Sequence, residues 1–283
     1  MDAVIDIGSN SVRLMLDRGW AVNKKDLVST VLSDGLAKTG FLSDEAMERT
    51  LVALSSFVQK AKTEGADNIY IFATEAMRSA ENGQEFANRI QNFVNIKVDI
   101  VSGEQEALLG LLGAYDGEDE LTVVDIGGAS VEVVRGNEKR LSYARSLPLG
   151  MVRLIDTVGS KREDIEKFVQ DKISGFGIVS GTDAVAIGGT ATSLASMDLG
   201  QKLYDQNEVH NHILTLSALR SLTDRIFASN NLLLDFPTLS KNRARVIGHG
   251  AIMLSSLVEY LGLDEIRVSE HDNLEGYLYL KRK

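Results

Sequence analysis

Apolar and polar residues alternate along the start of this chain in a pattern that predicts a β-hairpin. A strand-like run at Ala3–Ile7 turns at Gly8 and returns as Ser11–Leu16. Successive side chains of a strand point to opposite faces, so Arg13 lies on the face opposite the apolar Val12. The pattern therefore predicts one apolar face for a core and one polar face that carries a positive charge.

The same hairpin occurs a second time at Val124–Val133. An ungapped alignment of Val4–Leu16 with Val123–Arg135 places Glu132 where the first copy has Arg13. Chance does not easily restore both the acid before the glycine and the serine after it, so we interpret the two runs as a duplication with one charge reversed. The identical pairs are Val4/Val123, Asp6/Asp125, Ile7/Ile126, Gly8/Gly127, Ser11/Ser130 and Val12/Val131.

Helical and strand periodicities alternate in the rest of the chain, which indicates mixed α/β sheets covered by helices. Ser43 is the expected N-cap of the first long helix, with two acids in the first turn. The predicted strands are Asn68–Ala73, Ile96–Val101 and Ala184–Ile187. The predicted helices are Ser43–Lys62, Glu85–Phe93, Glu104–Tyr115, one from about Thr190, Leu219–Ala228, Lys241–Leu261 and Asn273–Lys281.

A length of 283 residues with an internal duplication favours two domains. The acidic, glycine-containing stretch Asp116–Glu120 resembles a junction, and the second hairpin starts directly after it. We therefore predict one domain over residues 1–119 and a second over residues 120–283.

Composition narrows the classes of protein. Apolar residues make up 44% and charged residues 25%, as in an ordinary globular protein. The net charge of −10 argues against nucleic-acid binding, and the absence of cysteine excludes disulfides and thiolate zinc sites. No apolar run is long enough for a membrane span, and the strand-like run at Val4 argues against a signal peptide. We expect a cytoplasmic protein.

Glycine turns mark three candidate anion sites. Gly8 and the pair Gly127-Gly128 lie at the hairpin turns, where successive N–H groups can form a nest for an anion. A third turn, Gly188-Gly189-Thr190, follows a strand and precedes a helix, so its N–H groups can face a phosphate, with Thr190 as a hydroxyl donor.

The whole chain resembles the exopolyphosphatase / guanosine pentaphosphate phosphohydrolase (Ppx/GppA) family in its short, two-domain form. The matching stretches are IDIGSNSVRL, ATEAMRSAEN, VSGEQEALLG, VDIGGASVEV followed by SLPLG, IGGTATSLA and LSKNRARVIGHGA. Sugar kinases share the glycine turns but not the ATEAMR and GEQEA segments. The resemblance implies two duplicated actin/Hsp70/sugar-kinase-like (ribonuclease H-like) domains with a cleft between them.

The resemblance also implies roles for individual residues. Glu106 orients or deprotonates the attacking water, with Glu104 as the alternative, and Asp125 and Glu132 are catalytic and hold Mg²⁺. The guanidinium groups of Arg13 and Arg78 bind phosphate oxygens. The complete expected phosphate-binding set is Ser9, Asn10, Ser11, Arg13, Arg78, Gly127, Gly128, Ser130, Gly188, Gly189 and Thr190.

The chain departs from the family pattern in two places. Ala129 stands where the family usually has the third glycine of GGGS, which is tolerable if φ is negative there. The segment VSEHDNLEG, residues 268–276, replaces a stretch that usually resembles VSDWGLREG, so that Leu274 takes the place of an arginine. We therefore expect no arginine contact from position 274, and Arg243 and Arg245 are the candidates to replace it.

The leading hypothesis is a Mg²⁺-dependent exopolyphosphatase acting on inorganic polyphosphate. Alternatives are hydrolysis of guanosine pentaphosphate, an ATP-dependent phosphotransferase, and a non-catalytic sensor of polyphosphate or alarmone. A second copy of the chain is a candidate partner; nucleic acid and membrane are not. The four histidines show no metal spacing, His210–His212 is interpreted as an exposed loop, and Trp20 as a packing or rim residue.

Overall fold

The computed structural model describes residues 1–117, 119–179 and 183–283. Contacts divide the chain into a first unit, Met1–Glu106 with Tyr277–Lys283, and a second unit, Ala107–Gly276. This division differs from the one predicted at residue 120. Most of α5 (Gly103–Ala114) belongs to the second unit, because its apolar residues share a core with the strand that follows it, and the end of the chain returns to the first unit. Glu118, within the predicted junction, lies outside the described residues.

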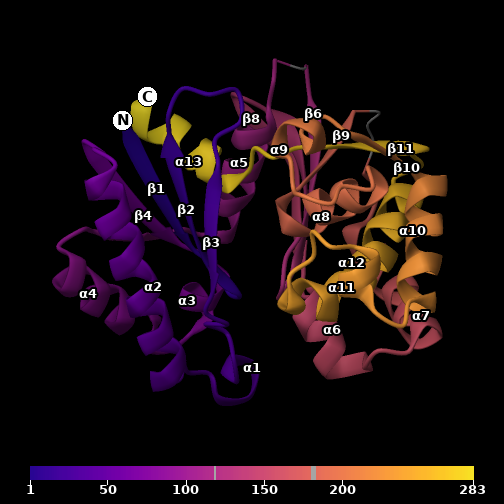
Figure 1. Ribbon diagram of the computed structural model, residues 1–283, viewed down its shortest axis with the longest axis horizontal. Helices are drawn as coiled ribbons and strands as arrows, with labels where there is room; N and C mark the ends of the chain where they lie inside the picture. Colours follow the sequence, from indigo (N-terminus) through magenta and orange to yellow (C-terminus); the bar gives the residue numbers. More distant parts are fainter. Residues whose placement is uncertain (118, 180–182) are drawn as a thin grey trace. The chain divides into compact units, whose positions relative to one another are not determined.

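The first unit contains a five-stranded sheet in the order β3-β2-β1-β4-β5 (Figure 1). The strands β1, β2 and β3 pair antiparallel, whereas β4 and β5 run parallel to β1 and are reached through helices. The strand bounds are β1 Asp2–Ile7, β2 Ser11–Asp17, β3 Lys25–Ser29, β4 Asn68–Ala73 and β5 Val98–Ile100.

Helices α2 and α4 supply the main apolar cover for one face of this sheet. Ser43 is the N-cap of α2, as predicted, and its hydroxyl accepts the N–H of Ala46 at 3.3 Å. Phe57 on α2 and Phe86 on α4 join Val12 and Leu14 of β2 in one buried cluster. The helix bounds are α1 Leu36–Thr39, α2 Asp44–Thr63, α3 Glu75–Ser79 and α4 Gly83–Val94.

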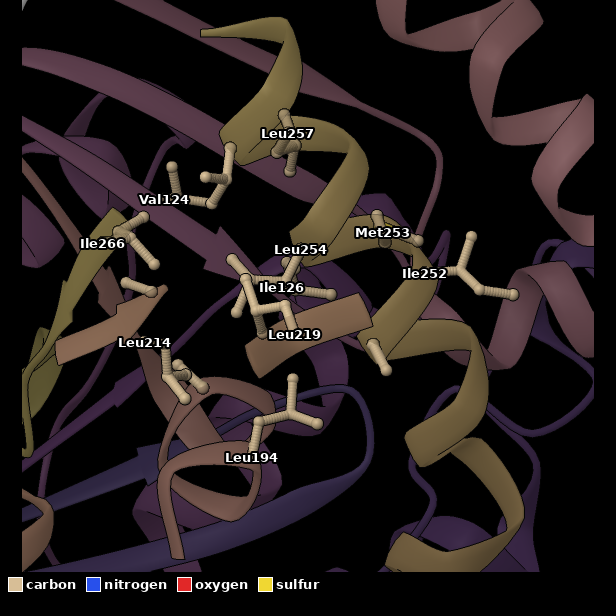
Figure 2. Packing of buried hydrophobic residues seen from close by; sticks show 14 of the residues in the cluster. Val124, Ile126, Leu194, Leu214, Leu219, Ile252, Met253, Leu254, Leu257 and Ile266 are labelled. Carbon is tan, nitrogen blue, oxygen red and sulfur yellow. The ribbon is translucent and has the colours of Figure 1, made fainter. Parts of the chain in front are cut away.

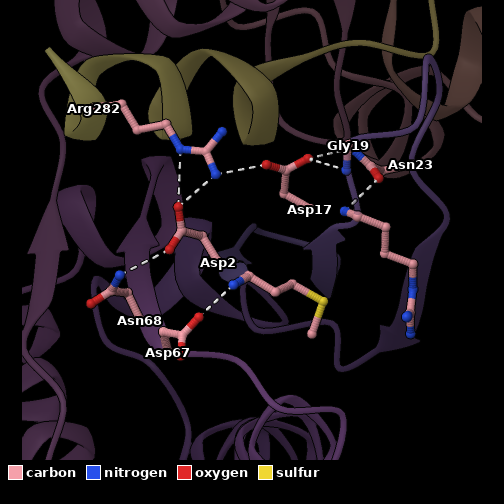
Figure 3. Close-up of polar contacts among 9 residues, drawn as sticks. Asp2, Asp17, Gly19, Asn23, Asp67, Asn68 and Arg282 are labelled. Atoms are coloured by element: carbon pink, nitrogen blue, oxygen red, sulfur yellow. Dashed lines mark hydrogen bonds and ion pairs between the residues drawn. The ribbon is translucent and has the colours of Figure 1, made fainter.

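The last turns of α13 (Asn273–Arg282) cover the other face of the same sheet. Tyr277 stacks on Phe72 of β4 with ring centroids 4.6 Å apart. Figure 3 shows the end of the helix, where Arg282 bridges the carboxylates of Asp2 and Asp17 at 2.6 and 2.7 Å. These contacts attach the C-terminus to the first two strands.

The second unit repeats this architecture and adds one strand. Its sheet order is β10-β11-β9-β6-β7-β8, so that β8-β7-β6-β9-β11 corresponds in order and direction to β3-β2-β1-β4-β5. The structure therefore shows two related α/β units, as the duplication predicted. The bounds are β6 Leu121–Ile126, β7 Val131–Asn137, β8 Arg140–Leu147, β9 Ala184–Ile187, β10 Ile213–Thr215 and β11 Glu265–Val268.

A large apolar core lies between this sheet and the helices α8, α10 and α12. Figure 2 shows Val124 and Ile126 of β6 among side chains of these helices, including Leu194, Leu219 and Leu254. Among the described residues, no helix is long and apolar enough to span a membrane. The remaining bounds are α6 Met151–Val158, α7 Arg162–Ile173, a 3-10 turn Ser174–Phe176, α8 Gly188–Asp198, α9 Gln206–Val209, α10 Leu216–Ala228, α11 Leu232–Asp235 and α12 Lys241–Tyr260.

Candidate active site

The two hairpins have the same backbone register. Asp6 lies directly opposite Arg13 in the first, and Asp125 lies directly opposite Glu132 in the second. Both turns close with the same hydrogen bond, from a glycine N–H to the carbonyl three residues later, at 3.0 Å in each case. The predicted duplication is thus present in three dimensions, residue for residue.

The turn of the first hairpin has its carbonyl groups tied back to the segment after β3. The N–H groups of Thr30 and Val31 donate to the carbonyl of Asn10, and Ser33 N–H donates to the carbonyl of Ser9. Within the described part of the chain, the N–H groups of Ser9 and Asn10 themselves have no acceptor. Consecutive N–H groups in this state form an anion nest.

The turn of the second hairpin is tied back by α6. The N–H groups of Met151 and Val152 donate to the carbonyls of Gly127 and Gly128 at 3.0 and 2.9 Å. The N–H groups of Gly128 and Ala129 have no acceptor among the described residues. Ala129 is not among the described non-glycine residues with positive φ, so the departure from GGGS costs no backbone strain.

The polar faces of the two hairpins differ in charge. Arg13 donates from Nε and Nη2 to one carboxylate oxygen of Asp6, at 3.0 and 2.5 Å, and Asp6 is only 4% exposed. The arginine that we expected to bind phosphate is therefore already paired with a buried carboxylate. Any phosphate that Arg13 binds shares the guanidinium with Asp6.

In the second hairpin the corresponding pair consists of two acids. Asp125 and Glu132 lie directly opposite each other on adjacent strands. Like charges at such positions destabilise the pairing of the strands. The carboxylate of Asp125 also lies against Gly188, where an added Cβ would come within 2.7 Å of Oδ1. Gly188 has φ of +79°, a conformation that favours glycine, and an added Cβ would also displace the Asp125 carboxylate.

Glu106 and Arg78 form an ion pair at the start of α5. Arg78 Nη1 donates to Glu106 Oε2 at 2.9 Å and to the carbonyl of Val101 at 2.8 Å, and Nη2 donates to Glu75. Burial acts to lower the pKa of Arg78, but the carboxylates of Glu106 and Glu75 outweigh it and raise that pKa. Arg78 thus stays charged and fixes the orientation of Glu106.

A capping box sets the start of α5 and therefore the position of Glu106. Gln105 N–H donates to the Ser102 hydroxyl at 3.1 Å, and Ser102 N–H donates to Gln105 Oε1 at 2.8 Å. We did not identify Ser102 from the sequence, although the spacing S-x-x-Q is the usual signal for this motif. Glu104, the alternative to Glu106, is exposed in the same turn.

The third glycine turn differs from the prediction in one residue. Thr190 is fully buried, and its hydroxyl donates to the carbonyl of Ile126 at 2.9 Å, so that it ties α8 to β6 and is not presented to a phosphate. Gly189 leaves room for Arg243, because an added Cβ would come within 2.2 Å of Nη2. Arg243 thus lies at the N-terminus of α8, whereas Arg245 is exposed on α12.

Residues 268–276, the segment that differs from the family pattern, contain the N-terminus of α13. Leu274 N–H donates to Asp272 Oδ1 at 3.0 Å, and Asp272 N–H donates to Glu275 Oε2 at 2.8 Å, which together make a capping box. Leu274, at the position of the family arginine, is fully buried. This position therefore contributes packing to the helix and no charge to a ligand.

Asp125 and Glu132 suit a magnesium ion. Mg²⁺ is usually held by one or two carboxylates together with water and substrate phosphates, and less often by a dedicated cage of protein ligands. Among the described residues, no group of three or more His, Asp or Glu side chains is arranged for a metal. The cross-strand pair of acids would supply oxygen ligands to such an ion.

The histidines of the 210–212 turn make hydrogen bonds within the protein, whereas Trp20 lies at the surface. Residues 210–212 form a turn, as predicted, but only Asn211 is exposed, since His212 Nε2 pairs with Asp198 at 2.8 Å and His210 Nδ1 accepts the N–H of Glu270. Trp20 is 54% exposed, with the guanidinium of Arg18 at 5.5 Å from the ring centroid.

Two α/β units of equal strand order, each beginning with a glycine-turn hairpin, define a duplicated actin/Hsp70/sugar-kinase-like fold. A model of the Ppx/GppA phosphatase family matches residues 22–283. The chain belongs to this family.

Individual relatives agree with the assignment. The chain is 30% identical, over 97% of its length, to a bifunctional 3-dehydroquinate synthase/phosphatase of Fusobacterium nucleatum, of which it covers 45%. It is 28% identical, over 98% of its length, to a guanosine-5'-triphosphate,3'-diphosphate pyrophosphatase of Photobacterium profundum, of which it covers 58%. The chain thus spans about half the length of these curated relatives. It superposes on the type II variant structure of the Aquifex aeolicus Ppx/GppA phosphatase with a TM-score of 0.82 and 29% identity, covering 100% of this chain and 99% of that one.

Proposed function

We propose that the chain is a phosphoanhydride hydrolase that removes terminal orthophosphate from inorganic polyphosphate with Mg²⁺. The observation that carries the proposal is the Arg78–Glu106 pair, which holds a carboxylate in a fixed orientation at the first turn of a helix. The positive end of the helix and the guanidinium both favour the ionised form of Glu106. An ionised, oriented carboxylate suits the positioning of an attacking water.

The remaining groups handle the negative charge of the substrate. The N–H groups of Ser9 and Asn10, and those of Gly128 and Ala129, are available to phosphate oxygens. Asp125 and Glu132 would hold the magnesium ion, which when bound neutralises charge on the phosphoryl group. Arg13, paired with Asp6, would add a charged hydrogen bond to phosphate from the first hairpin.

Guanosine pentaphosphate is the second candidate substrate. The named activity of the Photobacterium relative favours it, and the phosphoanhydride chemistry is the same. The groups proposed above would contact phosphate only, so they would serve either substrate.

The test compares phosphate release from long polyphosphate, guanosine pentaphosphate and ATP, each with and without Mg²⁺. We expect Mg²⁺-dependent release from polyphosphate that exceeds the release from the other two. Preference for guanosine pentaphosphate would establish the second candidate. Transfer from ATP to an acceptor would indicate a phosphotransferase, and binding without release would indicate a sensor.

Glu106→Gln tests the mechanism, with Glu104→Gln as the matched control in the same helical turn. We expect Glu106→Gln to lower turnover by roughly 100-fold or more while polyphosphate still binds, and Glu104→Gln to change it little. Equal turnover in the two variants would remove Glu106 from the reaction.

A further inference from the structure

A serine extends the acidic pair of the second hairpin onto a third strand. Asp125 on β6 faces Glu132 on β7, and Glu132 in turn faces Ser146 on β8. Directly opposed residues on adjacent strands project from the same face of a sheet. The three side chains therefore form one polar row across β6, β7 and β8.

Ser146 makes a short hydrogen bond to the central member of this row. Its hydroxyl donates to Glu132 Oε1 at 2.6 Å. Hydroxyl donors to ionised carboxylates reach such distances because the acceptor is charged, and these bonds are stronger than neutral ones. The local ladder is regular, because the register shift between β7 and β8 lies at the other end, at Arg135/Gly136. The bond thus fixes the carboxylate in one orientation.

The first hairpin has no such serine. There Arg13 faces Leu27 on β3, a residue with 53% exposure and no hydrogen-bonding side chain. A hydroxyl therefore accompanies the acid of one copy, whereas an exposed leucine accompanies the arginine of the other. This difference ties the serine to the function of the carboxylate and not to the stability of the hairpin.

We propose that Ser146 is a positioning residue that holds the Glu132 carboxylate in the orientation for binding magnesium. This inference rests on the proposed function, in which Asp125 and Glu132 are the metal ligands. Hydrogen-bond donors behind a metal-binding carboxylate fix its direction, and their loss typically weakens metal binding or activity by about 10- to 100-fold. Ser146 makes no contact with the metal or the substrate in this proposal.

The experiment measures Mn²⁺ binding, with Mn²⁺ as a probe for Mg²⁺, by electron paramagnetic resonance without substrate. We expect Ser146→Ala to raise the dissociation constant by roughly 10-fold or more, and Ser146→Thr, which keeps the hydroxyl, to stay within about threefold of the wild type. Ser142→Ala is the matched control. Ser142 is also exposed on β8, but its hydroxyl donates to the carbonyl of Arg135, so that its removal should leave Mn²⁺ binding unchanged.

Asp125→Asn separates failure of this inference from failure of the proposed metal site. If Asp125→Asn weakens Mn²⁺ binding and Ser146→Ala does not, Ser146 has no positioning role and the metal site stands. If neither substitution changes Mn²⁺ binding, the metal is not held by this row, and both proposals are overturned. If Ser146→Ala and Ser146→Thr weaken Mn²⁺ binding equally, the hydroxyl has no positioning role.

Discussion

The two hairpins of this protein have one backbone and two charge patterns. In the first, Asp6 and Arg13 neutralise each other across the strands, whereas in the second Asp125 and Glu132 repel each other at the same positions. A cross-strand pair of opposite charges contributes about 0.2–1 kcal/mol to stability, and like charges are destabilising. The first hairpin therefore holds a neutralised pair, whereas the second holds two acids at the same positions, a charge pattern that a bound cation would compensate.

Removing one acid from the second hairpin should have the largest effect on activity. Asp125→Asn relieves the repulsion but removes an expected magnesium ligand, so we expect activity to fall by about 100-fold or more and the Mg²⁺ requirement to rise. A Mg²⁺ titration of phosphate release measures both. An unchanged titration midpoint would contradict the assignment of Asp125.

Giving the second hairpin the charge pattern of the first should have opposite effects on stability and on activity. Glu132→Arg places an arginine opposite Asp125, as Arg13 lies opposite Asp6. Without Mg²⁺ we expect the free energy of unfolding to rise by about 1 kcal/mol, while the Mg²⁺-dependent stabilisation and the activity are lost. Urea denaturation with and without Mg²⁺ tests this, with Glu138→Arg on the turn after β7 as the control for added charge. A loss of stability in Glu132→Arg alone would show that the two hairpins are not interchangeable frameworks.

Local sequence signals predicted much of this arrangement. The hairpins, their apolar faces and the strand Asn68–Ala73 follow from period-two patterns, and the N-cap at Ser43 from residue type. The capping boxes Ser102/Gln105 and Asp272/Glu275 are equally local motifs. Each has a polar residue followed three positions later by Gln or Glu, so the sequence alone was sufficient to predict them. The sequence was also sufficient to predict the partner of Arg13, because a tight turn at Gly8 places Asp6 opposite Arg13.

Other features depend on contacts that no local pattern contains. Tyr277 reaches Asp99, which lies 178 residues earlier in the sequence. Arg282 reaches Asp2 across nearly the whole length of the chain (Figure 3). The edge strands β3 and β8 were missed because one of their faces is exposed and their apolar periodicity is weak. The burial of Thr190 was missed because a hydroxyl after two glycines fits a phosphate donor and a core hydrogen bond equally well.

Breaking the ion pair of the first hairpin should lower the free energy of unfolding more than removing one acid from the second hairpin does. Asp6→Asn leaves Arg13 without its carboxylate in a largely buried position. Loss of one partner of a fully buried pair costs about 3–5 kcal/mol, and since Arg13 is partly exposed we expect about 2 kcal/mol. Urea denaturation of Asp6→Asn beside Asp125→Asn, both without Mg²⁺, makes the comparison. Equal loss of stability in the two variants would contradict the distinction between the hairpins.

The smallest expected effect is a difference in how the two units respond to mild acid. His249, in the second unit, is 3% exposed, its Nε2 contacts the carbonyl of Gly159 at 2.8 Å, and burial lowers its pKa below 6.5. Below about pH 6.5 the unfolded chain therefore binds a proton that the folded chain does not, so stability falls as the pH drops toward the lower folded pKa.

The first unit should keep its stability over the same range of pH. Although burial acts to raise the pKa of Asp99, hydrogen bonds from Lys281, Lys97 and Tyr277 hold it well below 3.8, so its contribution persists until the pH falls below that value. Hydrogen exchange at about pH 7.5 and about pH 5.5, corrected for intrinsic rates, should show protection falling in α12 before β1 and α2. His249→Gln keeps a donor near Gly159 without a titrating group and should remove the difference. If α12 weakens equally in that variant, another group in the second unit is responsible.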